Sequence, residues 1–239
     1  MPEIPFGITA LFLTIIAGVV AAFVTGTRNA GERLGETPAT AGRQTVIAGT
    51  LLAIWLAVTA AAALSGILQS SGGPPPLLAF VGPAFVVVTV LAWSRFGTRL
   101  ADGLSLAGLV GYQVFRVPLE LVLYWLHVID VVPVQMTFEG LNFDVVSGLS
   151  AAVVAWLAAK RQLPAWALLL WNVVGFALVL TIVVISILSA PGPLRTFTNE
   201  PANTFVSTFP YVWLATFLVP AAIFGHLLVF RRWWRDRQA

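Results

Sequence analysis

The 239-residue sequence contains no cysteine, one lysine and two histidines. Without cysteine, the chain has no disulfide, no thiolate metal ligand and no cysteine nucleophile. Two histidines are too few for a three-histidine zinc site, and Lys160 lies outside the last apolar segment, where a retinal Schiff base would require a lysine. The sequence therefore predicts no metal and no cofactor.

Charged residues are also scarce, at 10% of the chain, whereas 59% of the residues are apolar and the mean hydropathy is +0.92. Several apolar runs reach the roughly 20 residues needed to cross a hydrocarbon core about 30 Å thick. No polar stretch is long enough to form a soluble domain. The composition predicts an all-α polytopic membrane protein whose residues 1–239 form one membrane domain in contact with a lipid bilayer.

A hydropathy scan predicts a bundle of seven transmembrane helices, separated by segments such as the turn "SSGGPPP" at 70–76. The first run follows Glu3 rather than a basic segment, so we expect a spanning helix there and not a cleaved signal peptide. The predicted spans are 6–26, 45–68, 77–93, 105–128, 144–159, 164–189 and 208–230.

The basic residues predict the orientation of this bundle. Arg116 lies within the fourth span and Arg195 lies in an outer loop, while the remaining 11 of the 13 Lys and Arg residues lie in the first, third and fifth loops or the C-terminal tail. The positive-inside rule then places the N-terminus outside and the C-terminus in the cytoplasm. The pI near 10 reflects this topology and indicates no nucleic-acid partner.

The fourth span has charged residues well inside its apolar run. Its polar side chains are spaced three or four residues apart and share one helix face: Gln113, Arg116, Glu120, Tyr124 and His127. Exposing Arg116 and Glu120 to lipid would cost several kcal/mol, so this face is predicted to point into the bundle, with the two residues forming an i,i+4 ion pair. Pro118 leaves the Val114 carbonyl without its helical donor, which predicts a local distortion.

Two outer loops place further polar groups near the outward end of this helix. The first is acidic and the second contains amides, so their side chains are predicted to converge on an extracytoplasmic mouth: Glu139, Asn142 and Asp144 in the first, and Asn199, Glu200 and Asn203 in the second. The alternative is that these are ordinary solvated loop residues.

Three segments, "RVPLE", "MTFEGLNFD" and "NEPANT", resemble those of a group of uncharacterised bacterial multi-pass membrane proteins. The likeness covers roughly residues 105–230 and implies a helical fold in a bacterial cytoplasmic (inner) membrane and a set of segments, but no activity. The matching positions are Arg116, Pro118, Glu120, Glu139, Gly140, Asn142, Asp144, Asn199, Glu200, Asn203, Pro220 and His226.

Three functions fit these features. The first is a module that binds or transports a small polar or anionic solute, or protons, with Arg116 as counter-charge and Glu120 or His226 handling protons. The second is a membrane-embedded enzyme acting on lipid or an extracytoplasmic substrate, with Glu139 and Asp144 as acid and base. The third is a non-catalytic partner subunit in which the ion pair serves packing. Nothing in the sequence indicates an oligomeric state.

Overall fold

The computed structural model describes residues 2–69 and 76–237, and its regular elements in these ranges are helices. The main helices are α1 (Phe6–Arg33), α2 (Pro38–Leu64), α3 (Leu78–Trp93), α4 (Arg95–Gly103), α5 (Leu106–Gly111), α6 (Arg116–Val128), α7 (Asp144–Ala159), α8 (Ala165–Ser189) and α9 (Val219–Asp236). Shorter elements are the 3₁₀ turns η1 (Ile67–Gln69), η2 (Tyr112–Phe115), η3 (Val134–Met136) and η4 (Phe205–Ser207), and the π-helical η5 (Leu214–Leu218).

Five of the described helices are long and apolar enough to cross a membrane: α1, α2, the continuous segment Leu106–Val128, α8 and the segment Leu214–Asp236. A sixth is obtained if α3 and α4, which meet at a bend of 65°, count as one broken span. Helix α7 is apolar but has only 16 residues. The prediction of an all-α membrane protein is therefore confirmed, while seven spans and their orientation stay predictions.

The bend between α3 and α4 is a local consequence of Ser94. Its hydroxyl accepts hydrogen bonds from the backbone N–H groups of Phe96 and Gly97, which caps a new helix one residue after the previous one ends. A Cβ at Gly97 would lie 2.1 Å from the Ala92 carbonyl oxygen, so the tight approach requires glycine. Hydropathy gave no sign of α4, because its polar and apolar residues average out along the segment.

Several predicted helix ends also differ from the structure. Helix α1 continues past residue 26 to Arg33, and α9 continues past residue 230 to Asp236. A hydropathy window stops at the first arginines, whereas the helical backbone continues while long basic side chains extend toward polar surroundings. Helix α2 begins earlier than predicted, at Pro38, because the Thr37 side chain caps it. The turn predicted at 70–76 lies almost entirely outside the described residues.

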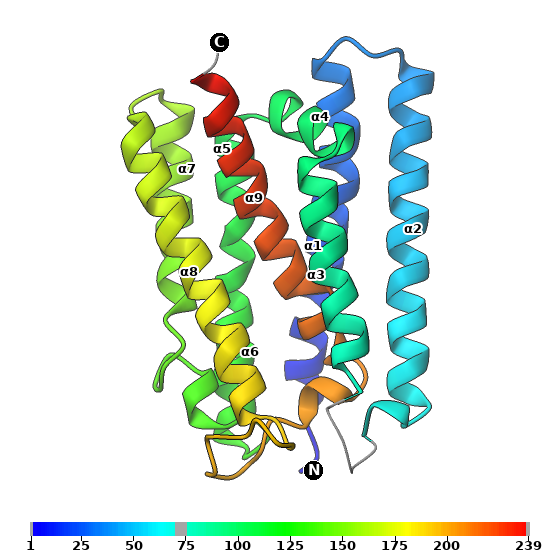
Figure 1. Ribbon diagram of the computed structural model, residues 1–239, viewed down its shortest axis with the longest axis vertical. Coiled ribbons are helices and arrows are strands. Elements are labelled where there is room, and N and C mark those ends of the chain that lie inside the picture. The colour runs from blue at the N-terminus through cyan, green and yellow to red at the C-terminus, as the bar shows by residue number, and fades with distance from the viewer. Residues whose placement is uncertain (1, 70–75, 238–239) are drawn as a thin grey trace.

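The helices run roughly along the long axis of the molecule, with α9 crossing between α8 and α3 (Figure 1). In the most apolar stretch of the segment Leu214–Asp236, which contains α9, 67% is buried. The corresponding share is 11% in α2, which packs at the periphery beside α1. The N-terminus and the α6–α7 and α8–η5 connections lie at one end of the bundle, and the C-terminus, α4 and the α1–α2 connection lie at the other (Figure 1).

Candidate functional site

Arg116, at the start of α6, is 1% exposed and makes a two-pronged ion pair with Asp144. Its Nε donates to Asp144 Oδ2 over 2.7 Å, and its Nη2 donates to Asp144 Oδ1. Its Nη1 donates to Ser147 Oγ over 2.7 Å and lies 3.1 Å from His226 Nε2. The guanidinium is thus held by α7 on one side and α9 on the other.

The predicted ion pair between Arg116 and Glu120 is therefore wrong. A guanidinium fork matches a carboxylate that meets it in its own plane, and the first turn of the neighbouring helix α7 supplies Asp144 in that position. Asp144, predicted as an outer-loop group, is buried at the N-terminus of α7. The distortion predicted around Pro118 coincides with η2, the 3₁₀ turn directly before α6.

His226 joins this cluster from α9 and is fully buried. Its Nδ1 lies 2.8 Å from Asn172 Oδ1, and Asn172 Nδ2 donates to the His226 backbone carbonyl over 3.0 Å. Because the Arg116 guanidinium only donates, His226 Nε2 accepts, and Nδ1 carries the proton that it donates to Asn172. His226 is thereby the neutral tautomer. It lies well inside α9, because the helix continues to Asp236 and does not end at residue 230 as predicted.

Glu120 lies one turn further along α6 and is 2% exposed. Its Oε1 accepts a hydrogen bond of 2.7 Å from Asn142 Nδ2, and Asn142 Oδ1 accepts the backbone N–H of Asp144. Asn142 therefore links the Glu120 carboxylate to the backbone of Asp144. The Glu120 Oε2 atom is buried, yet it has no hydrogen-bond partner among the described residues.

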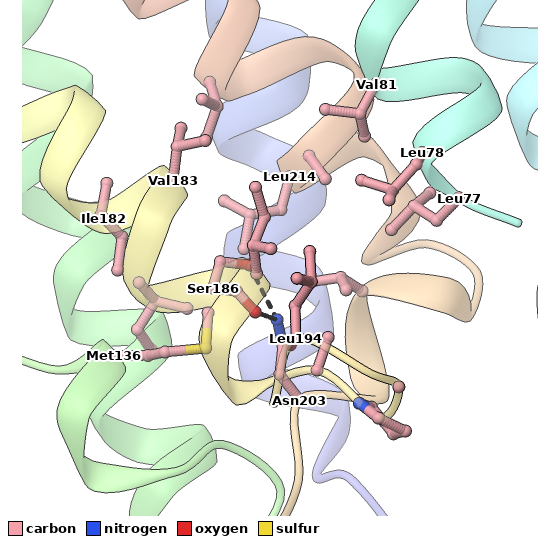
Figure 2. Close-up of a pocket in the computed structure, with 18 of the residues that line it drawn as sticks. Leu77, Leu78, Val81, Met136, Ile182, Val183, Ser186, Leu194, Asn203 and Leu214 are labelled. Carbon is pink, nitrogen blue, oxygen red and sulfur yellow. Dashed lines mark hydrogen bonds between the residues drawn. The ribbon is translucent and has the colours of Figure 1, made fainter. Parts of the chain in front are cut away.

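A pocket of about 330 Å³ adjoins Glu120. Figure 2 shows its walls, with Leu78 and Val81 of α3 and the preceding Leu77 facing Ile182 and Val183 of α8, and Leu214 between them. The volume is at the lower end of the ~300–1,000 Å³ typical of ligand sites. The polar residues among those that line it are Glu120, Asp144, Ser186 and Asn203.

Asn203 contributes a second unpartnered oxygen to this pocket. Its Nδ2 donates to the Ser186 backbone carbonyl over 2.9 Å and to Ser186 Oγ over 2.7 Å (Figure 2). Because a carbonyl accepts only from the amide nitrogen, this bond fixes the orientation of the amide. The Asn203 Oδ1 atom is buried and has no partner among the described residues.

Two residues that line the pocket, Glu120 and Asn203, thus each have a buried oxygen without a partner among the described residues. In the part of the chain that the structure describes, no Lys, Arg or His side chain lines it. Arg116 points its guanidinium at Asp144, Ser147 and His226. This arrangement suits a ligand that donates hydrogen bonds, and it offers little to an anion.

The other predicted residues lie away from the pocket. Gln113 is buried and donates to the Ala222 carbonyl over 3.0 Å, which ties the start of the span to α9. Tyr124 is partly buried and stacks on Phe138, and Glu139 is exposed. The remaining pair of predicted residues serves the α8–η5 connection.

In that connection, Asn199 donates to Gln135 Oε1 over 2.8 Å. Glu200 is 72% exposed and pairs with Arg195, whose hydrogen bond lowers the pKa of the Glu200 carboxyl. Of the ten predicted binding residues, the structure brings Arg116, Glu120, Asn142, Asp144 and Asn203 to the pocket or directly behind it.

Three polar residues at the site are absent from the predicted set: Ser147, Asn172 and Ser186. Asn172 carries the clearest sequence signal, because an amide deep inside an apolar span needs a buried partner. Within the described residues, no group of three His, Cys, Asp or Glu side chains is placed to hold a metal ion.

No family model, curated protein or solved structure matches this chain.

Proposed function

We propose that the chain is a seven-span protein of a bacterial cytoplasmic membrane, with its N-terminus outside. The seventh span would be α7, which is apolar and packs along the Leu106–Val128 segment and α8. The end of the bundle with the C-terminus also holds α4 and the α1–α2 connection, where Arg99 and Arg33 lie (Figure 1). This grouping of basic residues supports a cytoplasmic assignment for that end.

We infer that the protein binds a small amphiphilic molecule in the pocket beside Glu120, as a binding or transport module. The observation that carries this proposal is the buried Glu120 Oε2 atom, which has no hydrogen-bond partner among the described residues and belongs to a residue that lines a mostly apolar pocket. A buried acceptor without a donor is costly, and native proteins rarely retain one without a ligand, ion or water to satisfy it.

The walls and the free atoms together define the ligand. Aliphatic side chains from α3, α6, α8 and η5 suit a hydrocarbon body. Glu120 Oε2 and Asn203 Oδ1 suit a head group that donates hydrogen bonds. This is a narrower ligand class than the small polar or anionic solute expected from the sequence, because the guanidinium of Arg116 is occupied by Asp144.

The geometry favours this role over the enzyme expected as an alternative. Glu139, the candidate acid, is exposed and does not line the pocket. Asp144, the candidate base, is held by both prongs of Arg116, and a carboxylate fixed in this way is a poor proton acceptor. No observation in the structure favours a partner-subunit role.

Thermal unfolding of the purified protein with and without 1-octanol and octylamine tests the proposal, because a ligand that binds only the folded state raises Tm. Val183→Trp fills the pocket, and its neighbour Val184→Trp places the same side chain on the exposed face of α8. We expect the ligands to raise the Tm of wild type and of Val184→Trp, and to leave the Tm of Val183→Trp unchanged. Equal shifts in both variants, or none in wild type, would refute pocket binding.

A further inference from the structure

The charges around Glu120 do not balance if Glu120 is ionised. Arg116 lies one turn earlier on α6, Asp144 faces it from α7, and His226 faces Arg116 from α9. The Arg116 guanidinium and the Asp144 carboxylate cancel, and His226 is neutral because its Nε2 accepts from Arg116. From α3, α8 and η5 the described pocket walls are uncharged. An ionised Glu120 would be the one uncompensated charge of the site.

An uncompensated charge in such surroundings is strongly disfavoured, so the empty pocket favours the protonated carboxylic acid. A cationic head group changes this balance, because it supplies the missing positive charge at the carboxylate. We propose that the ligand is a lipophilic ammonium ion and that it takes the place of the Glu120 proton. This inference rests on the proposed function.

The exchange is balanced in atoms and charge. The O–H bond of the Glu120 carboxylic acid breaks, its electron pair stays on the carboxylate, and the proton leaves to solvent. The ammonium ion then donates N–H hydrogen bonds to Glu120 Oε2 and Asn203 Oδ1, which belong to pocket-lining residues and have no partner among the described residues. One cation enters for each proton that leaves, so the net charge of the site does not change.

The pocket offers a route for the entering cation and for the leaving proton. Besides the helices, its lining includes the turn Pro191–Leu194, and Leu194 is 58% exposed. This turn lies in the connection that follows α8, at the end of the bundle opposite the C-terminus (Figure 1). Cation entry and proton release therefore occur from the side that the proposed topology places outside.

Proton release on ligand addition tests this exchange. Octylamine, an ammonium ion between pH 6 and pH 8 because alkylamines ionise near the Lys value of about 10.4, is added to the purified protein in weak buffer with a pH indicator. We expect about one proton per bound octylammonium, and an apparent affinity that rises toward about tenfold per pH unit while empty Glu120 stays protonated. 1-Octanol, a neutral donor, should release no proton.

Two variants separate exchange from simple binding. Glu120→Gln keeps an acceptor oxygen but cannot ionise, so octylammonium should release no proton and its binding should lose pH dependence. Glu139→Gln makes the same change at an exposed carboxyl and should behave as wild type. Octylammonium binding without proton release in wild type, or release that persists in Glu120→Gln, would overturn the exchange while leaving pocket binding intact. Absence of binding by every probe would refute the proposed function itself.

Discussion

The Arg116 guanidinium binds Asp144 of the next helix, while Glu120, one turn away, keeps one carboxylate oxygen without a partner among the described residues. Arg116 and Glu120, which share a helix face, therefore have different roles. Arg116 joins α6, α7 and α9 into one cluster, and Glu120 borders the pocket. Packing and ligand binding can then be separated by mutation.

Removing one member of the Arg116–Asp144 pair leaves a buried charge without its partner. We expect Arg116→Met or Asp144→Leu alone to lower the free energy of unfolding by about 3–5 kcal/mol, and the double variant to recover most of that loss. Unfolding in detergent monitored by circular dichroism measures the difference. The matched control is Arg116→Met with Glu120→Leu, which should not recover stability, and recovery there instead would restore the pairing expected from the sequence.

Gly175 on α8 is required by close packing at the same cluster. A Cβ there would lie 2.7 Å from His226 Cε1 and 2.8 Å from Ser147 Oγ. Gly175→Ala should therefore cost about 1–3 kcal/mol of stability, since the ring cannot move without leaving Asn172 or Arg116. Gly18→Ala on α1 meets nothing within 4 Å and serves as the control in the same thermal unfolding assay. Equal effects of the two changes would contradict this packing.

The Glu36–Arg99 pair predicts a pH dependence at the other end of the bundle. Arg99 donates to both Glu36 oxygens, and this hydrogen bonding lowers the pKa of the Glu36 carboxyl from its ordinary 4.5. A lowered folded-state pKa gives stability that is complete above about 4.5 and is lost as the pH falls through the lower value. Glu36→Gln should thus lower Tm at pH 7, and the Tm difference from wild type should shrink below pH 4. A constant difference across this range would exclude the pair as its cause.

The proposed topology is testable because the chain has no native cysteine. Thr198→Cys and Ala39→Cys introduce single thiols at exposed positions of the two opposite ends. In intact cells a membrane-impermeant maleimide should label position 198, and it should label position 39 only after permeabilisation. The reverse pattern would invert the bundle.

The sequence predicted the buried face of the fourth span, because charged residues at helical spacing are costly in lipid and therefore face the interior of the bundle. Gln113, Arg116 and Glu120 are each at most 2% exposed, as expected, while Tyr124 is only partly buried. The partner of Arg116 was not predictable from spacing along one helix, since the choice between Glu120 and Asp144 depends on how α7 packs against α6. Spacing alone favoured the neighbour in sequence.

The pocket was still harder to anticipate. Its aliphatic walls come from several segments far apart in the chain, and residues such as Val183 and Leu214 look in the sequence like ordinary lipid-facing positions. Asn203 was expected at an outer mouth, and the structure places its amide against Ser186 of α8 instead of in solvent. Helix α4 was not predicted either, because the polar and apolar residues of this short helix average out in a hydropathy scan.

The charge preference of the pocket tests the central claim most directly. Octylammonium, 1-octanol and octanoate each contain eight carbon atoms and differ mainly in the charge of the head group, so we compare their equilibrium dissociation constants for the purified protein at pH 8. We expect octylammonium to bind most tightly, octanol more weakly and octanoate not measurably, because the described pocket lining contains the Glu120 carboxyl and no Lys, Arg or His side chain to balance an anion. Tightest binding by octanoate would contradict this account and return Arg116 to the role of counter-charge for an anion.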